Sequence, residues 1–294
     1  MKDPVDEEIK KFITKPLSDS KFIRVTVPKY PRISIVTPSF NQSVFLERTI
    51  LSVLNQNYPN LEYIIIDGGS TDGSVDIIKR YSEYLSYWVS EKDKGQAEAI
   101  NKGFKLATGD ILAWLNSDDL YLPDCLLKVG SGFVRNRTIG FIYGHSLLID
   151  KDDNSIRYLY SIPQTYHSYI YDGGNVFQGA VFWRKEIFCK HGMLDESLEF
   201  AMEYKLFDSF FKYERGAFVN DVLAAFRIHA AAKSSTIAHI GSTELARIRG
   251  KRFGILSGIY YKCRWVFYYI IYGNLVKTLR ERAKSPSEQL YRTS

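Results

Sequence analysis

Short apolar runs alternate with longer helical patterns between Arg32 and Tyr121, and this alternation constrains the fold more than any other feature of the sequence. The predicted strands are Ile33–Thr37 (ending at Pro38), Leu61–Asp67, Tyr87–Ser90 and Asp110–Leu115, and the predicted helices are Val44–Asn55, Ser74–Leu85 and Gln96–Ala107. Strand–helix–strand repeats of this kind predict an α/β domain with a mixed, mainly parallel sheet flanked by helices.

The composition narrows the class of protein without naming a function. A chain of 294 residues with 45% hydrophobic content can bury a full core, which excludes disordered and fibrous classes. The net charge is +6, and 24% of the residues are charged, which is an ordinary fraction for a globular protein. We therefore expect no nucleic-acid partner. Cys125, Cys189 and Cys263 are far apart and form no ligand motif, so neither a disulfide framework nor a zinc site is expected. A reducing cytosol is the simplest compartment.

Three polar segments follow predicted strands, and we expect them to meet. They are Thr37–Asn41, the loop DGGSTDG at Asp67–Gly73, and NSDD at Asn116–Asp119. Ligands of open α/β sheets bind just beyond the carboxyl ends of parallel strands. The sequence therefore predicts a ligand site at this edge of the sheet.

The NSDD segment is the candidate metal site. Oxygen ligands from Asn116, Asp118 and Asp119 would project together from a strand end, as Mg²⁺ or Mn²⁺ requires. Acidic residues are also common at turns and helix starts, so NSDD by itself favours a solvated turn that caps the helix after Pro123.

The loop after the second strand is the candidate nucleoside site. Asp67 could accept the imide N–H of a uracil, and Asp93, beside the permissive Gly95, is a second candidate. The alternative is that Asp67 and Asp72 only order a tight turn, which we favour for Asp72. Lys102 is either a phosphate contact or a surface lysine.

Beyond Pro123 the pattern loosens. We predict helices at Cys125–Val134 and Glu199–Lys212 and strands at Gly140–Asp150 and Arg157–Ser161. The predicted organisation has four parts: an N-terminal extension (1–31), a nucleotide-binding half (32–121), an acceptor half (122–238) and a helical, basic and aromatic C-terminal extension (239–294).

The two ends of the chain bear on localisation. The acidic N-terminus lacks an apolar region typical of a secretory signal, and the stretch Trp265–Tyr272 is too short to span a bilayer. The tail Leu245–Lys284 mixes Arg and Lys with aromatic residues, which is typical of a segment at a membrane surface. Packing against protein, as an oligomerisation or core-capping helix pair, is the alternative. We expect a cytoplasmic protein, at the inner face of the plasma membrane if the tail binds lipid.

Several motifs in this order and spacing resemble the family 2 glycosyltransferases of the GT-A fold, over about Arg32 to Ser235. They are SIVTPSFNQ, LEYIIIDGGSTDGS, EKDKGQAEAINKGF, TGDILAWLNSDDLYLP and FQGAVFWRKEIFCKHGMLDESLEFAMEYKLF. The resemblance implies a nucleotide-sugar donor, a UDP-sugar, and a glycan or lipid-linked glycan acceptor. It implies cell-surface polysaccharide or glycan synthesis and a divalent metal, Mn²⁺ or Mg²⁺, as cofactor.

The resemblance also assigns residues to the donor site. Asp118 would bind the metal, whereas Asn116 stands where many members have an acidic residue. His229 and Lys233, in FRIHAAAKS, would contact the metal or the diphosphate. The expected nucleotide contacts are Thr37, Pro38, Phe40, Asp67, Asp93, Gly95 and Lys102; the expected pocket residues are Asp119, Gln178, Trp183 and Lys233.

Glu203 stands where family members place an aspartate as general base, and Lys205 replaces a frequent acidic residue beside it. The resemblance implies one inverting displacement, in which Glu203 deprotonates the acceptor hydroxyl. Three other readings remain: a glycosidase, which needs no nucleotide; a sugar nucleotidyltransferase, for which no basic triphosphate loop is evident; and an inactive nucleotide-sugar or carbohydrate-binding protein.

Overall fold

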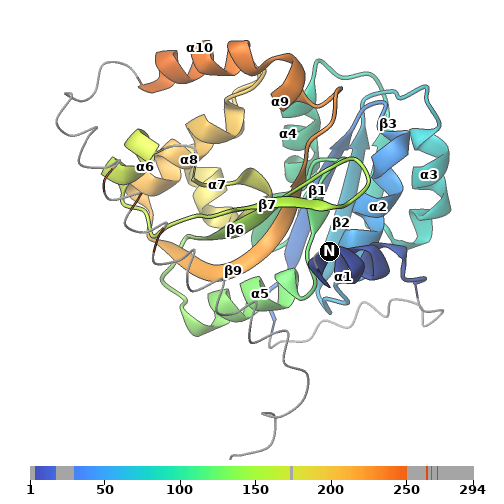
Figure 1. The fold of residues 1–294 in the computed structure, drawn as a ribbon, viewed down its shortest axis with the longest axis horizontal. Helices are drawn as coiled ribbons and strands as arrows, with labels where there is room; N and C mark the ends of the chain where they lie inside the picture. Colours follow the sequence, from blue (N-terminus) through green and yellow to red (C-terminus); the bar gives the residue numbers. More distant parts are fainter. Residues whose placement is uncertain are drawn as a thin grey trace, which may run out of the picture. The chain divides into compact units, whose positions relative to one another are not determined.

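The protein folds as helices packed around one nine-stranded mixed sheet (Figure 1). The computed structural model describes residues 4–17, 30–172 and 175–249, together with Cys263, Val266 and Ile270. The described helices are α1 (Pro4–Thr14), α2 (Ser43–Leu54), α3 (Ser74–Arg80), α4 (Gln96–Leu106), α5 (Cys125–Arg135), α6 (Tyr166–Asp172), α7 (Lys185–His191), α8 (Met202–Tyr213), α9 (Lys233–Thr236) and α10 (Ala238–Arg249). Short 3₁₀ turns lie at Ser82–Tyr84 and Gln178–Ala180.

The sheet has the order β3-β2-β1-β4-β8-β6-β9-β5, with β7 paired to β6. The strands are β1 (Ile33–Ser39), β2 (Leu61–Asp67), β3 (Tyr87–Ser90), β4 (Ile111–Trp114), β5 (Leu120–Tyr121), β6 (Phe141–Ile149), β7 (Ser155–Leu159), β8 (Val181–Arg184) and β9 (Gly216–Arg227). The first four strands are parallel to one another, and β8 joins them antiparallel to β4. The predicted fold class, a mixed α/β sheet flanked by helices, is confirmed.

The first half follows the predicted elements closely because each has a clear period and end signal. The helix predicted over Ser74–Leu85 instead ends at Arg80 and continues as the 3₁₀ turn Ser82–Tyr84. In the second half, β8 and the long β9 were not predicted. Strand β9 runs parallel to β6 with register shifts near His145, and its pairing partners are far away in sequence.

Strand β1 extends two residues past its predicted end, through Pro38 to Ser39. Proline lacks the N–H that a central strand needs. Pairing with β4 stops at Val36, whereas pairing with β2 continues to Ser39. The backbone N–H of Leu115 donates to the carbonyl of Val36, so the backbone groups of Val36 point toward β4. Position 38 is two residues later and points to the same side of β1, but there it lies beyond the end of β4. The missing donor therefore leaves no ladder bond broken.

Two apolar clusters hold these layers together. The larger joins the sheet to α2, α4, α5, α7 and α8. The smaller contains Ile9 and Ile13 of α1 together with Leu120, Leu147 and Ala225 from β5, β6 and β9. The predicted N-terminal extension thus contributes a helix to the core, and Asn55 at the end of α2 donates to the carbonyls of Phe12 and Lys15.

The chain divides into two compact units, Met1–Lys251 and Arg252–Ser294. The extension predicted from residue 239 therefore begins inside the first unit, within α10. The basic and aromatic segment predicted over Leu245–Lys284 lies almost entirely outside the described residues. Within the described part of the chain, no helix has the length and hydropathy of a membrane span.

Candidate active site

Asp118 and His229 meet at the carboxyl edge of the sheet. Asp118 follows β4 and His229 follows β9, and the Oδ2 of Asp118 lies 3.0 Å from the Nε2 of His229. Their side chains are 18% and 8% exposed, so both groups are sheltered but reachable. Adjacent ligands of an octahedral ion with bonds of roughly 2.1 Å lie about 3 Å apart, so this pair fits two neighbouring coordination positions.

A metal held here would need further ligands from outside the protein. Among the described residues, no group of three or more His, Cys, Asp or Glu side chains is placed to hold an ion. Two protein ligands leave most of the coordination shell of Mg²⁺ or Mn²⁺ open, and phosphate oxygens suit these hard cations. The residues present therefore fit a metal that binds together with a diphosphate.

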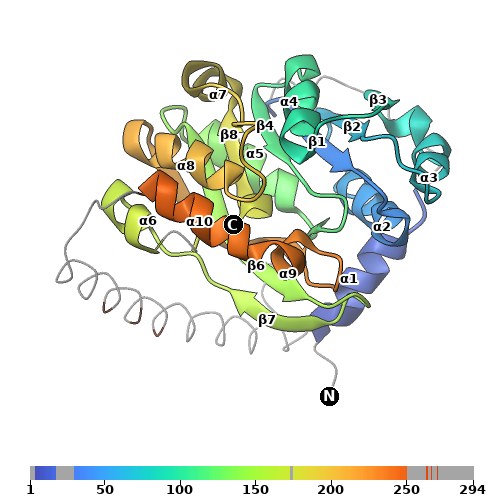
Figure 2. The same ribbon diagram turned by 90° about the horizontal axis from the view of Figure 1, so that it is seen from above.

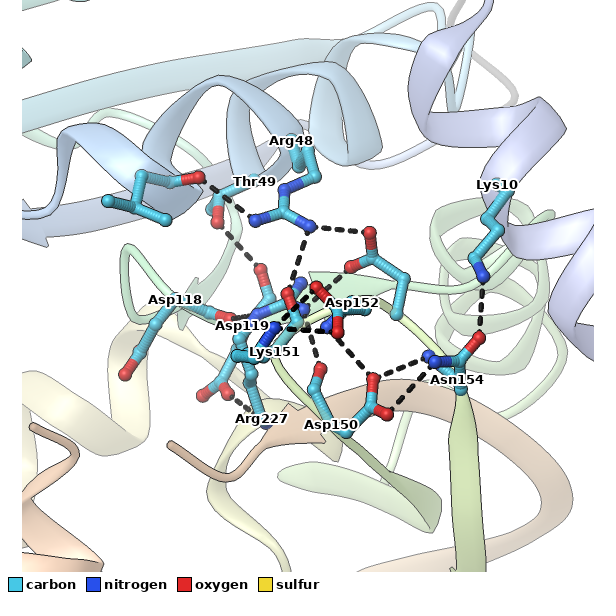
Figure 3. Close-up of polar contacts among 12 residues, drawn as sticks. Lys10, Arg48, Thr49, Asp118, Asp119, Asp150, Lys151, Asp152, Asn154 and Arg227 are labelled. Carbon is cyan, nitrogen blue, oxygen red and sulfur yellow. Dashed lines mark hydrogen bonds and ion pairs between the residues drawn. The ribbon is translucent and has the colours of Figure 1, made fainter. Parts of the chain in front are cut away.

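Arg227, the last residue of β9, holds the Asp118 loop from below (Figure 3). Its side chain is fully buried, and its Nε donates to the carbonyl of Asp118 at 2.7 Å. Its backbone N–H donates to Oδ1 of Asp119 at 2.9 Å. The guanidinium also lies 4.9 Å from the ring centre of Phe45. One residue thus fixes both acidic residues of the NSDD segment.

The charge of Arg227 is balanced by the turn between β6 and β7. Its Nη1 donates to the carbonyl of Asp150 at 2.9 Å and lies 2.6 Å from Oδ1 of Asp153. Arg48 of α2 bonds the other oxygen of Asp153 at 2.6 Å. Helix α1 adds a third support, since Lys10 donates to Asn154 in the same turn (Figure 3). This turn supports the loop that carries Asp118.

Asp119 is part of this support and not of the open site. It is 3% exposed, and its Oδ2 accepts a hydrogen bond from the side-chain amide of Asn116. Burial, reinforced by the neighbouring charge of Asp118, raises the pKa of Asp119 well above its ordinary value. The structure therefore corrects the predicted pocket role: the side chain of Asp119 orders the loop.

Asn116 sits at the centre of a chain of amides. Its Oδ1 accepts from Gln96 at 2.8 Å, and its Nδ2 donates to Asp119 at 3.1 Å and to Oε1 of Gln178 at 3.4 Å. Gln178 in turn donates to the carbonyl of Trp114 at 2.7 Å. The predicted pocket residue Gln178 is thus half-buried beside the site, and the oxygen of Asn116 is already engaged by Gln96.

Asp67 is fully buried and orders its own loop. Its carboxylate accepts hydrogen bonds from the backbone N–H groups of Gly69 and Ser70 and from the hydroxyls of Ser70 and Ser90, at 2.6–3.1 Å. This geometry gives Asp67 the turn-ordering role that had been the alternative prediction. Asp72 does the same just before α3, where it accepts from Ser74, and it also accepts from the backbone N–H of Ser43 at the start of α2.

Asp93 lies over the same loop and is more open than Asp67. A Cβ at Gly68 would lie 2.7 Å from Oδ2 of Asp93, so the glycine makes room for this carboxylate. Burial raises the pKa of Asp93, and the charges of Glu98 and Asp67 add to the effect. Gly95 adopts a φ of 136°, which side chains rarely adopt. Asp93 and Gly95 therefore form a surface that a ligand can approach.

The remaining predicted nucleotide contacts divide into buried and exposed residues. The hydroxyl of Thr37 bonds that of Tyr63 inside the core, and Pro38 is buried in β1. Phe40, at the end of β1, is 60% exposed. Lys102 bonds Glu91 at 2.5 Å, which raises the pKa of the lysine. Of these four side chains, Phe40 is the one presented to solvent next to the loop.

Trp183 is a core residue and not a pocket wall. It is fully buried on β8, where its ring packs against Trp114, Phe104 and Phe207 with centroids 5.6–6.2 Å apart. Aromatic pairs at these distances contribute packing energy in addition to area burial. The structure thus selects the packing alternative for this residue.

Glu203 lies in the first turn of α8 and faces charged groups from α9 and α10. Burial raises its pKa to about 7; the positive charge of Lys233 opposes the shift and the negative charge of Glu244 adds to it. Lys233 also donates to the carbonyl of Glu199 at 3.0 Å, and burial lowers its pKa. A carboxyl group that titrates near neutrality is suited to proton transfer.

Arg227 and Glu244 are the residues that sequence patterns missed. Arg227 precedes the His-containing segment and reads as an ordinary strand residue, and its partners lie up to 109 residues away. Glu244 lies in α10, outside the motifs that resemble the family, and no sequence pattern around it indicates a role. Their roles depend on long-range contacts, which no local spacing encodes.

Known proteins share both the fold and parts of the sequence. An uncharacterized glycosyltransferase of Rickettsia prowazekii is 30% identical over 215 residues, 70% of this chain and 67% of the relative. A putative teichuronic acid biosynthesis glycosyltransferase, TuaG of Bacillus subtilis, is 38% identical over 122 residues, 40% of this chain and 48% of the relative.

Solved structures resemble the fold at low sequence identity. Residues 1–349 of S. aureus TarS, in complex with UDP-GlcNAc, match with a TM-score of 0.58 and 16% identity, over 74% of this chain and 65% of that chain. The mannosyltransferase PcManGT from Pyrobaculum calidifontis, in complex with GDP-Man and Mn²⁺, matches with a TM-score of 0.56 and 16% identity, over 96% and 88%. The model of the family described as Glycosyl transferase family 2 matches residues 34–191, more than half of the chain, and the protein therefore belongs to glycosyltransferase family 2.

Proposed function

We propose that this protein is a metal-dependent, inverting transferase that moves a sugar from a nucleotide-diphosphate sugar, a UDP-sugar, to an acceptor hydroxyl. The observation that carries the proposal is the 3.0 Å approach of Asp118 and His229, two groups 111 residues apart that fit neighbouring metal positions. Family membership supports the reaction class. The donor and Mn²⁺ in the two structural neighbours support the choice of ligands.

The nucleoside is assigned to the surface formed by Asp93, Gly68, Gly95 and Phe40. The exposed Phe40 ring offers a face on which a base can stack, and Asp93 can accept a hydrogen bond from an imide N–H. Asp67 supports this surface from beneath through its four loop contacts. We assign it no direct contact with the base.

The diphosphate is assigned to the Asp118–His229 edge, with Lys233 at the far side. A bound divalent ion would supply Lewis-acid stabilisation of the departing diphosphate. Asp118 and His229 orient that end of the donor, and Arg227 keeps the loop of Asp118 in place through its carbonyl. The negative charges of Glu203 and Asp93 both act on the Lys233 cation, so we place this lysine between the donor side and the acceptor side.

Glu203 is assigned as the general base. Its half-buried carboxylate takes the proton from the acceptor hydroxyl as that oxygen attacks the anomeric carbon, on the face opposite the leaving nucleotide. A pKa of about 7 makes the group a stronger base than an ordinary glutamate while leaving a large ionised fraction at neutral pH. No covalent intermediate is required.

The acceptor is assigned by class only, as a glycan or a lipid-linked glycan in polysaccharide synthesis. TuaG, in teichuronic acid biosynthesis, and an Escherichia coli chondroitin synthase that is 31% identical over 147 residues support this assignment. We place the reaction in the cytoplasm, at the inner face of the membrane. Flotation with anionic vesicles, with and without residues after 251, tests the membrane contact. Equal flotation of both forms would refute it.

A ligand screen tests the proposed function. UDP-GlcNAc, other UDP-sugars and GDP-mannose are added with Mn²⁺ or Mg²⁺, and melting temperature and release of the nucleotide are measured. A ligand that binds only the native state raises the melting temperature. We expect one donor to stabilise the protein with metal and to be turned over. If a donor stabilises the protein but none is turned over with any acceptor, the second candidate, an inactive binding protein, is identified. Asn116 and Lys205, which stand where many family members have acidic residues, are the reason for this second candidate.

A further inference from the structure

The segment just before α8, residues 199–201, is held by a carboxylate from α10. The backbone N–H groups of Glu199, Phe200 and Ala201 donate to the two oxygens of Glu244 at 2.9, 3.0 and 2.8 Å. Three successive backbone donors on one carboxylate form an anion-binding concavity occupied by a side chain of the same protein. Glu244 is 9% exposed, and these bonds lower its pKa, so it stays ionised.

Two further contacts hold the same segment from the same side. Lys233 of α9 donates to the carbonyl of Glu199 at 3.0 Å. Gly241, one turn before Glu244, lies so close to Phe200 that an added Cβ would overlap the phenyl ring. The two ribbon views show α10 alongside α8 (Figures 1 and 2). All three residues of the segment are therefore fixed by α9 and α10.

The position of this segment determines the position of Glu203. Ala201 is the N-terminal flanking residue of α8, and Glu203 lies in the first turn that follows. The described structure gives α8 no side-chain cap of its own at Ala201. The first N–H groups of a helix lack intrahelical partners, and helix ends without caps fray. Glu244 supplies a negative charge at the amino end of this helix from another part of the fold.

We infer that Glu244 is a positioning residue for the general base: its carboxylate sets the start of α8 and thereby aims the Glu203 side chain at the acceptor hydroxyl. This inference rests on the proposed function, since it assumes that Glu203 is the base. It extends the catalytic unit to a helix that lies beyond residues 34–191, the part that the family model matches. Glu244 contacts residues 199–201 and not the loops to which we assign the donor.

The charges around Glu203 give the positioning role a measurable signature. Lys233 from α9 lowers the pKa of Glu203 and Glu244 from α10 raises it, while Glu199 and Asp93 act on Lys233. Burial is the main cause of the raised pKa of Glu203 and stays in place when Glu244 is neutralised, but the smaller contribution of the Glu244 charge is removed. The pH at which the base becomes half-ionised should then fall, in addition to any loss of alignment.

The test compares E244Q with E214Q. Glu214 lies at the other end of α8, where its carboxylate accepts from Lys190 and His191, and its side chain is 15% exposed. It is thus a partly buried glutamate at the C-terminal end of the same helix as Glu203, and its side chain bonds α7. In both variants kcat, the KM for the donor, the pH profile of kcat and the melting temperature are measured, with the UDP-sugar or GDP-mannose that the wild type turns over with Mn²⁺.

We expect E244Q to lower kcat at least tenfold, to leave the donor KM within about twofold, and to move the half-maximal pH of kcat downward. E214Q should lower the melting temperature without moving the pH profile. Equal effects of the two variants on kcat and pH profile would overturn the inference and leave Glu244 a stabilising residue only. Wild-type inactivity toward every donor would instead refute the proposed function.

A second variant covers the case in which E244Q does not fold. Gly241→Ala raises the intrinsic helix propensity of α10, which favours folding, but its Cβ must displace Phe200. We expect a folded protein with a reduced kcat and an unchanged donor KM. Full wild-type kcat in a folded G241A protein would contradict the role of α10 in placing the base.

Discussion

The Nε of Arg227 donates to the backbone carbonyl of Asp118 at 2.7 Å. A buried cation 109 residues further along the chain therefore fixes the position of the candidate metal-binding loop. The bond is to the main chain, which leaves the Asp118 carboxylate available to His229 and to a ligand. Removing this contact changes the loop without changing its ligands.

Replacement of Arg227 by Lys should lower both stability and metal affinity. Lysine keeps the charge but cannot reach Asp118, Asp150 and Asp153 together, as the forked guanidinium does. Breaking a buried ion pair costs roughly 3–5 kcal/mol, and R227K should lose a substantial part of this. Chemical denaturation and a Mn²⁺ titration with UDP check the result. Arg184→Lys, at a half-buried arginine that bonds carbonyls far from the site, is the control.

Replacement of Asp118 by Asn or of His229 by Gln should abolish stabilisation by Mn²⁺ plus nucleotide diphosphate. Each change removes one of two protein ligands, and neutral amide oxygens bind hard cations more weakly than carboxylates. Thermal melts with metal, nucleotide and both together measure the effect. Asp152→Asn, in an exposed residue of the neighbouring turn, should retain the full stabilisation. A normal melting shift in D118N would remove the basis of the metal assignment.

Activity should rise with pH through about 7, because Glu203 accepts a proton only when ionised and its pKa is raised to about 7. The raised pKa also has a stability consequence. Between the unfolded pKa near 4.5 and about 7, the native state holds a proton that the unfolded state has released, so Glu203 makes stability fall as pH rises through this window. E203Q should lose turnover at least a hundredfold and be more stable than wild type at pH 8 but not at pH 4. A pH-independent stability difference would contradict the assignment of this pKa.

Replacement of Asn116 by Asp should weaken the protein and fail to strengthen metal binding. The new carboxylate would face the buried Asp119 and the Oε1 of Gln178, and it could not donate to either as the amide does. A buried polar group that loses its partner costs about 1–3 kcal/mol. Denaturation and a Mn²⁺ titration check the outcome. An increase in Mn²⁺ affinity would show that position 116 contributes a ligand.

Replacement of Gly68 by Ala should reduce nucleotide affinity without reducing metal affinity. The added Cβ would come within 2.7 Å of Oδ2 of Asp93 and push this carboxylate out of place. Isothermal titration with UDP measures the loss. Gly73→Ala is a matched control in the same loop, since a Cβ there meets nothing within 4 Å. Because Gly73 has a φ of 96°, this variant introduces backbone strain without displacing a side chain. Equal affinities for UDP in both variants would contradict the role of Asp93.

The sequence predicts the parallel half of the sheet because short apolar runs alternate there with helical patterns. It also places Asp118 and His229 near each other, through the resemblance to a family. It offers turn ordering by Asp67 only as an alternative, since the four hydrogen bonds to this carboxylate depend on donors that converge in space. The burial of Trp183 and the pairing of β9 with β6 also depend on long-range contacts. The assignment of Glu203 and Lys233 to the reaction stays a prediction.

The packing of α1 has a consequence for the order in which the chain is made. Ile9 and Ile13 are synthesised long before Ala225 of β9, which completes the cluster that buries them. Contacts this distant in sequence form late, and exposed apolar surface in a partly made chain promotes aggregation. Part of the apolar face of α1 therefore stays uncovered until β9 has been synthesised.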